Sequence, residues 1–185
     1  MAASEWARGL AESLLAQSLP RRWAHTQGVA GAAARLAPLA ADDADLLVAA
    51  ALLHDIGYAP AIAVTGFHPL DGARFLHEEH RADDRLVRLV ANHTFALLEA
   101  QERGLRAELE AEFPILDNPL LVDALTYADM TTTPDGEPTT PPARIAEILR
   151  RYGLETVVGR FIQRAEPEIL AAAARVDCLL ADYPR

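Results

Sequence analysis

The stretch ALLHDIGYAP, residues 51–60, ends an apolar run with a histidine and an aspartate, His54 and Asp55. Two adjacent polar side chains beside a core must be hydrogen-bonded or bound to a metal ion. Similar groups stand on the apolar faces or at the ends of other predicted helices: His25, His68, His93 and Asp129. A cluster of imidazoles and carboxylates without cysteine suits Fe, Mn, Zn, Co or Ni rather than a structural thiolate site.

Six such groups exceed what one ion needs if that ion is also to hold water and substrate. Adjacent residues of a helix point about 100° apart. His54 and Asp55 can therefore serve one ion only at a helix end, or while Asp55 bridges two ions. The bridging arrangement describes a two-metal site, with ions about 3.5–4 Å apart, which clamps an attacking and a leaving oxygen.

The ordered set His25, His54-Asp55 and Asp129 resembles the H…HD…D pattern of the HD-domain superfamily of metal-dependent phosphohydrolases. HDIG at residues 54–57 is the form common in small, stand-alone bacterial members. His68 and His93 look like the pair that carries a second metal in dinuclear members. The resemblance covers about residues 25–129. It implies a globular all-α fold, Asp55 as the metal bridge, and attack on phosphorus by a metal-bound water or hydroxide.

The sequence therefore predicts a metal-dependent phosphohydrolase for a small phosphate ester or nucleotide. The first ion is assigned to His25, His54, Asp55 and Asp129, and the second to Asp55, His68 and His93. Two divalent ions are expected, iron first, with Mn, Co, Ni or Zn as alternatives. Asp55 and His68 are the predicted catalytic residues. Alternatively, His68 and His93 donate hydrogen bonds to residues that bind the metal, or one of them is the acid that protonates the leaving oxygen.

Three residues are predicted to bind substrate: Arg74, Thr132 and Arg144. The guanidinium fork of arginine suits phosphate, although a surface salt bridge is an equal alternative for both arginines. Thr132 closely follows Asp129 and offers a hydroxyl, or simply continues the loop. His77 and His80, in LHEEH, are expected at a solvated helix end rather than at a metal.

Two other functions remain open. A mixed-valent di-iron oxygenase acting on a small polar substrate, as in a subset of the same superfamily, uses six such ligands. It would consume oxygen and need iron, whereas a hydrolase would turn over a phosphate ester without oxygen. A non-catalytic module that senses a nucleotide is the third reading, and the complete ligand set argues against it.

The helical period runs through almost the whole chain and predicts an all-α domain of roughly eight or nine helices. Residues 1–185 are expected to form one HD domain, with the metal-site core at about 21–130 and C-terminal helices at 143–183. Residues 95–112 are predicted as one helix, and Pro167 is expected to split the last one. The Thr/Pro-rich insert 131–142 is predicted to be a loop that folds over another part of the molecule.

The 185 residues carry a formal net charge of -10 and no lysine, so all 17 basic residues are arginine. The lack of lysine excludes Schiff-base chemistry and a P-loop. The acidic balance argues against binding to a nucleic-acid duplex, and no apolar run is long enough to span a membrane. Cys178 is expected to be a buried thiol. A cytoplasmic location and a small phosphorylated partner are expected, and a homodimer is left open.

Overall fold

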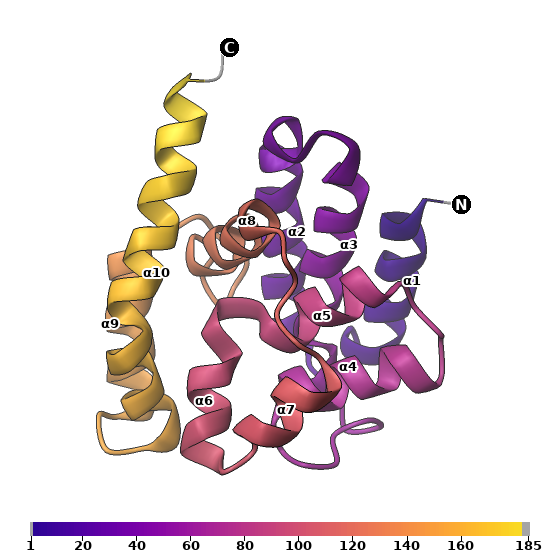
Figure 1. Cartoon of the computed structure of the whole chain (residues 1–185). Helices are drawn as coiled ribbons and strands as arrows, with labels where there is room; N and C mark the ends of the chain where they lie inside the picture. Colours follow the sequence, from indigo (N-terminus) through magenta and orange to yellow (C-terminus); the bar gives the residue numbers. More distant parts are fainter. Residues whose placement is uncertain (1, 183–185) are drawn as a thin grey trace.

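The computed structural model describes residues 2–182, which contain no β-strand, so the predicted all-α fold is confirmed. These residues form ten α-helices and three short 3-10 helices (Figure 1). The α-helices are α1 (Ala3–Leu15), α2 (Pro20–Ala40), α3 (Ala44–Leu53), α4 (His68–Glu78), α5 (Asp84–Asn92), α6 (Ala96–Arg103), α7 (Arg106–Glu112), α8 (Pro119–Met130), α9 (Pro141–Tyr152) and α10 (Val157–Asp182). None of them combines the length and apolar character needed to cross a membrane.

Helix α3 lies at the centre of the main core. Leu47 and every residue from 49 to 53 are buried, and α1, α2, α5 and α8 pack around the helix. A helix that is apolar on all sides is stable only in such a surrounding. Because α3 ends inside the core, the two residues that follow it, His54 and Asp55, are also buried.

Helices α9 and α10 pack together beside α8 and form a second, smaller core (Figure 1). Its buried residues include Met130 from α8, Ile148 from α9 and Phe161 from α10. The C-terminal end of α10 extends past the neighbouring helices (Figure 1). Cys178 lies on this end and is exposed, so the prediction of a buried thiol is wrong.

Two helix boundaries differ from the expected ones. Residues 95–112 form two helices, α6 and α7, because Gly104 ends α6 in the left-handed conformation with φ 74°. Helix α10 runs through Pro167 without a break. Proline removes one backbone donor, but Ala165 and Ile169 on either side of it are fully buried. The helix is therefore packed against its neighbours on both sides of the proline.

The insert between α8 and α9 is a loop of residues 131–140 that lies on α2, and the predicted end at residue 142 falls inside α9. Thr132 and Pro138 form an isolated antiparallel bridge. Gly136 has φ 85°, and a Cβ at this residue would lie 2.4 Å from the carbonyl oxygen of Ala24. On α2 itself, a Cβ at Gly28 would lie 2.4 Å from the carbonyl oxygen of Gly136. Only glycine permits this backbone approach at both positions.

Candidate metal centre

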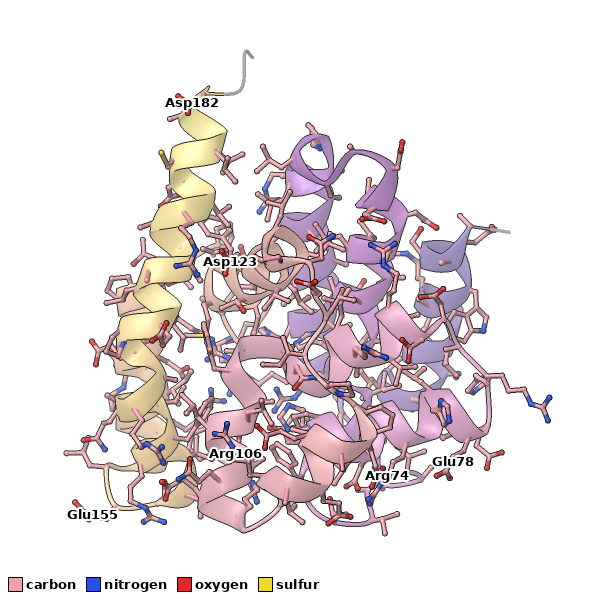
Figure 2. All side chains as sticks on the ribbon, in the orientation of Figure 1. Arg74, Glu78, Arg106, Asp123, Glu155 and Asp182 are labelled. Atoms are coloured by element: carbon pink, nitrogen blue, oxygen red, sulfur yellow. The ribbon has the colours of Figure 1, made fainter. Side chains whose placement is uncertain are left out.

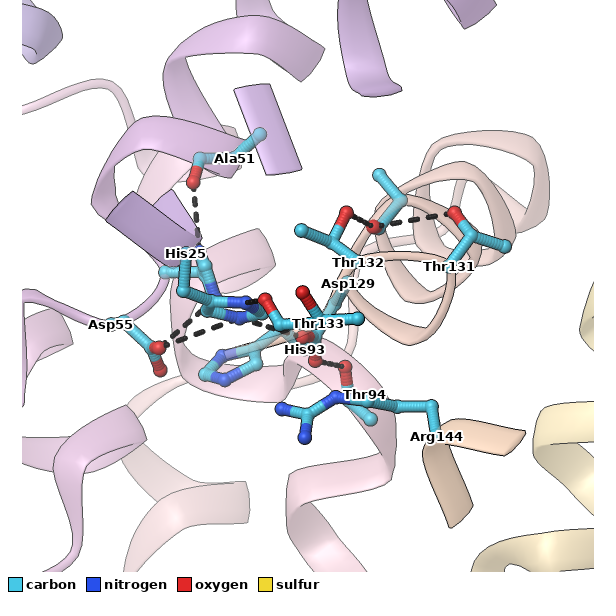
Figure 3. A network of polar contacts seen from close by, with 12 residues as sticks. His25, Ala51, Asp55, His93, Thr94, Asp129, Thr131, Thr132, Thr133 and Arg144 are labelled. Atoms are coloured by element: carbon cyan, nitrogen blue, oxygen red, sulfur yellow. Dashed lines mark hydrogen bonds and ion pairs between the residues drawn. The ribbon is translucent and has the colours of Figure 1, made fainter. Parts of the chain in front are cut away.

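The fold brings all six predicted ligands together from five different segments. Figure 3 labels four of them: His25, Asp55, His93 and Asp129. His25 lies on α2, and Asp129 lies on α8. His54 and Asp55 follow α3, His68 begins α4, and His93 follows α5. Five of the six residues are less than 9% exposed, and the side chain of His68 is 11% exposed.

Asp55 stands between two groups of histidines. Its Oδ2 lies 3.3 Å from Nε2 of His54 and 3.8 Å from Nε2 of His25. Its Oδ1 lies 3.3 Å from Nε2 of His68, which in turn lies 3.2 Å from Nε2 of His93. We call His25, His54 and Asp55 the first triad, and Asp55, His68 and His93 the second triad. Within each triad the potential ligand atoms all lie within 4.8 Å of one another.

The backbone fixes which ring nitrogen three of these histidines present to the site. Nδ1 of His25 lies 2.9 Å from the carbonyl oxygen of Thr133. Nδ1 of His54 and of His93 lie 2.7 and 2.6 Å from carbonyl oxygens three residues earlier. A carbonyl oxygen only accepts, so each Nδ1 carries hydrogen, and each neutral ring keeps its lone pair on Nε2. This is the usual orientation of metal-binding histidines.

One polar atom at the centre has the surroundings of a metal ligand. Nε2 of His54 is buried and has no hydrogen-bond partner among the described residues. A buried polar atom without a partner is costly. A divalent ion between His54, His25 and Asp55 would satisfy it, and these donor types suit Fe, Mn, Co, Ni or Zn.

Asp129 closes the first triad from the side of α8. Its Oδ1 lies 3.1 Å from Nε2 of His25, and its Oδ2 accepts a hydrogen bond of 2.6 Å from Oγ1 of Thr94. Thr94 and Phe95 both have positive φ, 48° and 60°. For residues other than glycine this conformation costs roughly 1–2 kcal/mol each. This strained turn directs the Thr94 hydroxyl toward Asp129, a predicted metal ligand.

The two triads differ in charge. Burial disfavours the ionised carboxylates, yet Arg22 and His54 hold the pKa of Asp55 well below its usual value. Burial also disfavours a charged His54, but the Asp55 carboxylate outweighs it and raises the pKa of His54 to about 9. Burial dominates for the other two rings and lowers the pKa of His68 and of His93.

Sequence reasoning missed one cation at the site, Arg22, which also contacts an aromatic ring. Nη1 of Arg22 donates a 2.7 Å hydrogen bond to Oδ2 of Asp55. The Arg22 guanidinium lies 4.0 Å from the ring centre of Tyr58, and Tyr58 stacks on His68 at 4.0 Å. Arg22 is three residues before His25, hence on the same face of α2, and this spacing was the available signal.

Of the predicted substrate-binding residues, only Arg144 faces the site (Figure 3). The residue is 7% exposed and forms a salt bridge with Glu147, while its buried Nε has no partner among the described residues. Arg74 lies at another edge of the molecule (Figure 2) and bonds to Glu108 and Glu112. Its predicted role in substrate binding is corrected to a surface ion pair.

The prediction for Thr132 is also corrected. Its Oγ1 donates to the carbonyl oxygen of Ala128 at 2.8 Å, and the residue is 2% exposed. Its methyl group packs against Gly28 of α2. Thr132 therefore holds the insert in place, and the threonine at the site is Thr94.

A cavity of about 90 Å³, which we call the main cavity, opens beside the two triads. Its far wall is apolar and comes from α9 and α10, with Ile148, Val158, Phe161 and Ile162. Glu99 also lines it and is 6% exposed. Burial raises the pKa of Glu99, although Arg103 bonds to its Oε1. Sequence reasoning missed Glu99, because its surrounding acidic run is typical of an exposed face.

Comparison with known protein families identifies the family of this chain. The family model described as HD domain matches residues 22–152, and the chain belongs to this family. The match covers all six clustered residues and ends with α9. No curated protein and no solved structure matches the chain. The HD-domain superfamily is one of metal-dependent phosphohydrolases, which agrees with the resemblance drawn from the H…HD…D pattern.

Proposed function

We propose that the protein hydrolyses a small phosphate ester or nucleotide with the help of two divalent metal ions. One observation carries the proposal: Asp55 presents one carboxylate oxygen to each of two histidine groups. A carboxylate that serves two neighbouring ions needs this arrangement. A single structural ion would not require His68 and His93 on the other side of Asp55.

The residues divide into two sets of ligands. His25, His54, Asp55 and Asp129 would hold one ion, and Asp55, His68 and His93 the other. When bound, such ions lower the pKa of a water molecule toward neutrality and offset the charge of a phosphoryl group. An anionic substrate needs this local positive charge because the chain as a whole has a formal net charge of -10.

The chain's own groups would position the substrate. Arg144 lines the main cavity with an unpartnered Nε, so it is a donor for a phosphate oxygen. Thr94 would keep Asp129 in place through its hydroxyl. His68 is assigned to metal ligation, because its Nε2 lies 3.3 Å from Oδ1 of Asp55 and 3.2 Å from Nε2 of His93.

The test combines metal analysis with an activity screen. Protein purified without chelator should contain about two ions per chain, as expected for a two-metal site. It should then release phosphate from p-nitrophenyl phosphate or from one of a panel of nucleotides under anaerobic conditions with Mn²⁺, Co²⁺ or Fe²⁺. Oxygen uptake with iron and no phosphate release under any condition would instead support the di-iron oxygenase. Metal binding without either activity would support a sensing module.

A further inference from the structure

A second cavity, of about 290 Å³, adjoins the main cavity and is here called the side cavity. Four arginines line it: Arg21, Arg22, Arg144 and Arg151. The remaining wall comes from His25, Pro134 and the turn at residues 18–20. Among the described residues, the lining of the side cavity includes no acidic side chain. Such a concentration of arginine is unexpected in a chain of formal net charge -10.

The side cavity and the main cavity have four lining residues in common: Arg22, His25, Arg144 and Arg151. Arg22 is also hydrogen-bonded to Asp55, the carboxylate between the two triads. The side cavity therefore begins at the metal centre itself. A ligand group in it would be the immediate neighbour of a group bound at Asp55.

The arginines are held in position by carboxylates behind them. Asp135 bonds to Arg21 on two nitrogens, and Glu147 bonds to Arg144 and Arg151. Each guanidinium has five N–H donors, so donors remain for a ligand. Arg144 gives the clearest indication, because it is 7% exposed and its buried Nε has no acceptor among the described residues. A buried donor without an acceptor is unfavourable, and an anionic oxygen would satisfy it.

We propose that the side cavity binds a second phosphate group, so that the substrate is a phosphoanhydride rather than a simple monoester. This inference rests on the proposed function and names its substrate class: a nucleoside polyphosphate or another diphosphate compound. The phosphorus that is attacked lies at Asp55, and the adjoining phosphate lies among Arg22, Arg144 and Arg151. A monoester with one phosphate would leave these donors without a ligand.

The reaction balances without any further reactant. An oxygen of water forms a bond to the attacked phosphorus, and the bond from that phosphorus to the bridging oxygen breaks. The bridging oxygen keeps the electron pair and stays with the phosphate in the side cavity. The proton of the water passes to the leaving phosphate or to solvent, so each product carries its own phosphate.

The test measures binding rather than turnover. Metal-loaded protein is titrated calorimetrically with methylenediphosphonate, which has two linked phosphoryl groups and cannot be hydrolysed, and with methylphosphonate, which has one. Arg151→Met and Arg144→Met remove donors from the side cavity. Arg150→Met is the matched control, because Arg150 is the neighbour of Arg151 on α9 but is exposed and is absent from the lining of both cavities.

We expect wild type and Arg150→Met to bind the diphosphonate more tightly than the monophosphonate. Loss of a hydrogen bond to a charged group should weaken diphosphonate binding about tenfold or more in each of the other two variants. Monophosphonate affinity and metal content should change little in Arg151→Met. Arg151 is exposed, so this variant tests the idea even if Arg144→Met is poorly folded.

Two results would overturn the inference. The first is equal loss of affinity for both probes, or no loss for either, in Arg151→Met. The second is no preference for the diphosphonate in the wild type. If monoesters are hydrolysed in either case, the proposed hydrolase activity stands and only the substrate class is wrong. If no phosphate compound is hydrolysed but the diphosphonate preference depends on Arg151, the proposed activity fails and the binding site remains.

Discussion

The two triads share Asp55 but are held in different ways. In the first triad both rings, His25 and His54, are oriented by backbone carbonyl oxygens. In the second triad His93 is oriented in this way, whereas His68 stacks on Tyr58. The acceptor for His25 comes from the insert, about a hundred residues further along the chain, and the acceptors for His54 and His93 are local.

The triads also differ in the protons they carry without metal. The pKa of His54 is about 9, so it is protonated at pH 7, whereas burial keeps His68 and His93 neutral. An ion that enters the first triad must displace a proton, and an ion that enters the second need not. The comparison teaches that two triads sharing one carboxylate can differ in the protonation of their histidines.

Replacing Asp55 should disable both triads, because they share this carboxylate. Asp55→Asn removes the charge between them, and we expect loss of both ions and a fall in hydrolysis of at least about 100-fold, since even outer partners of a metal ligand are worth 10–100-fold. Metal content per chain and phosphate release measure the outcome. Asp43→Asn, at the other end of α3, is the control. Two ions retained in Asp55→Asn would refute the bridging role.

Replacing His93 should separate the triads. His93→Ala removes one ligand of the second triad and none of the first, so metal content should fall from about two ions per chain to about one. Elemental analysis of protein dialysed against excess Mn²⁺ gives the count. His77→Ala changes an exposed histidine of α4 and should keep both ions. An unchanged content in His93→Ala would move His93 out of the ligand set.

The insert should matter for the first triad alone. In Gly28→Ala the new Cβ meets the backbone of Gly136, so the insert must shift and His25 loses its acceptor on Thr133. We expect about 10–100-fold weaker metal binding at the first triad, the usual effect of losing such a partner. Competition with a fluorescent chelator measures both sites. Gly31→Ala is the control, because its nearest neighbour is 3.9 Å away.

Metal affinity should respond to pH at one triad only. Between pH 9 and 7, His54 gains a proton in the metal-free protein, so the affinity of the first triad should fall about tenfold per pH unit. The second triad should change little, because the pKa values of its histidines are lowered. Chelator competition at pH 7, 8 and 9 provides the measurement. Parallel slopes for the two sites would contradict the assigned protonation states.

The smallest effect is expected at Arg74. Arg74→Met removes a surface ion pair with Glu108 and Glu112, and neither of these residues belongs to a triad. Such exposed pairs contribute about 0–1 kcal/mol to the free energy of unfolding. Urea denaturation should show at most this change, with metal content and activity unaltered. A marked loss of activity would restore the substrate-binding role that the structure withdraws from Arg74.

The sequence alone predicted the helical fold and the six residues that cluster at the candidate metal centre. The apolar period identified the helices, and His25, His54, Asp55 and Asp129 form an ordered motif whose chemistry is recognisable from residue types and spacing. His68 and His93 were identified because they begin or end helices. These features are local, or depend on order along the chain, so one sequence is enough to show them.

Only the tertiary structure decided which other residues reach the centre. No role at the site was predicted for Arg22, Thr94 or Glu99, and Arg74 has the right type but lies elsewhere. The left-handed turn at Thr94 and Phe95 opposes local preference. Packing between distant segments imposes it, just as packing carries α10 through Pro167. The Arg22–His25 spacing shows only that both residues share one face of α2, and the contacts of Thr94 and Glu99 with the centre arise from the packing of distant segments.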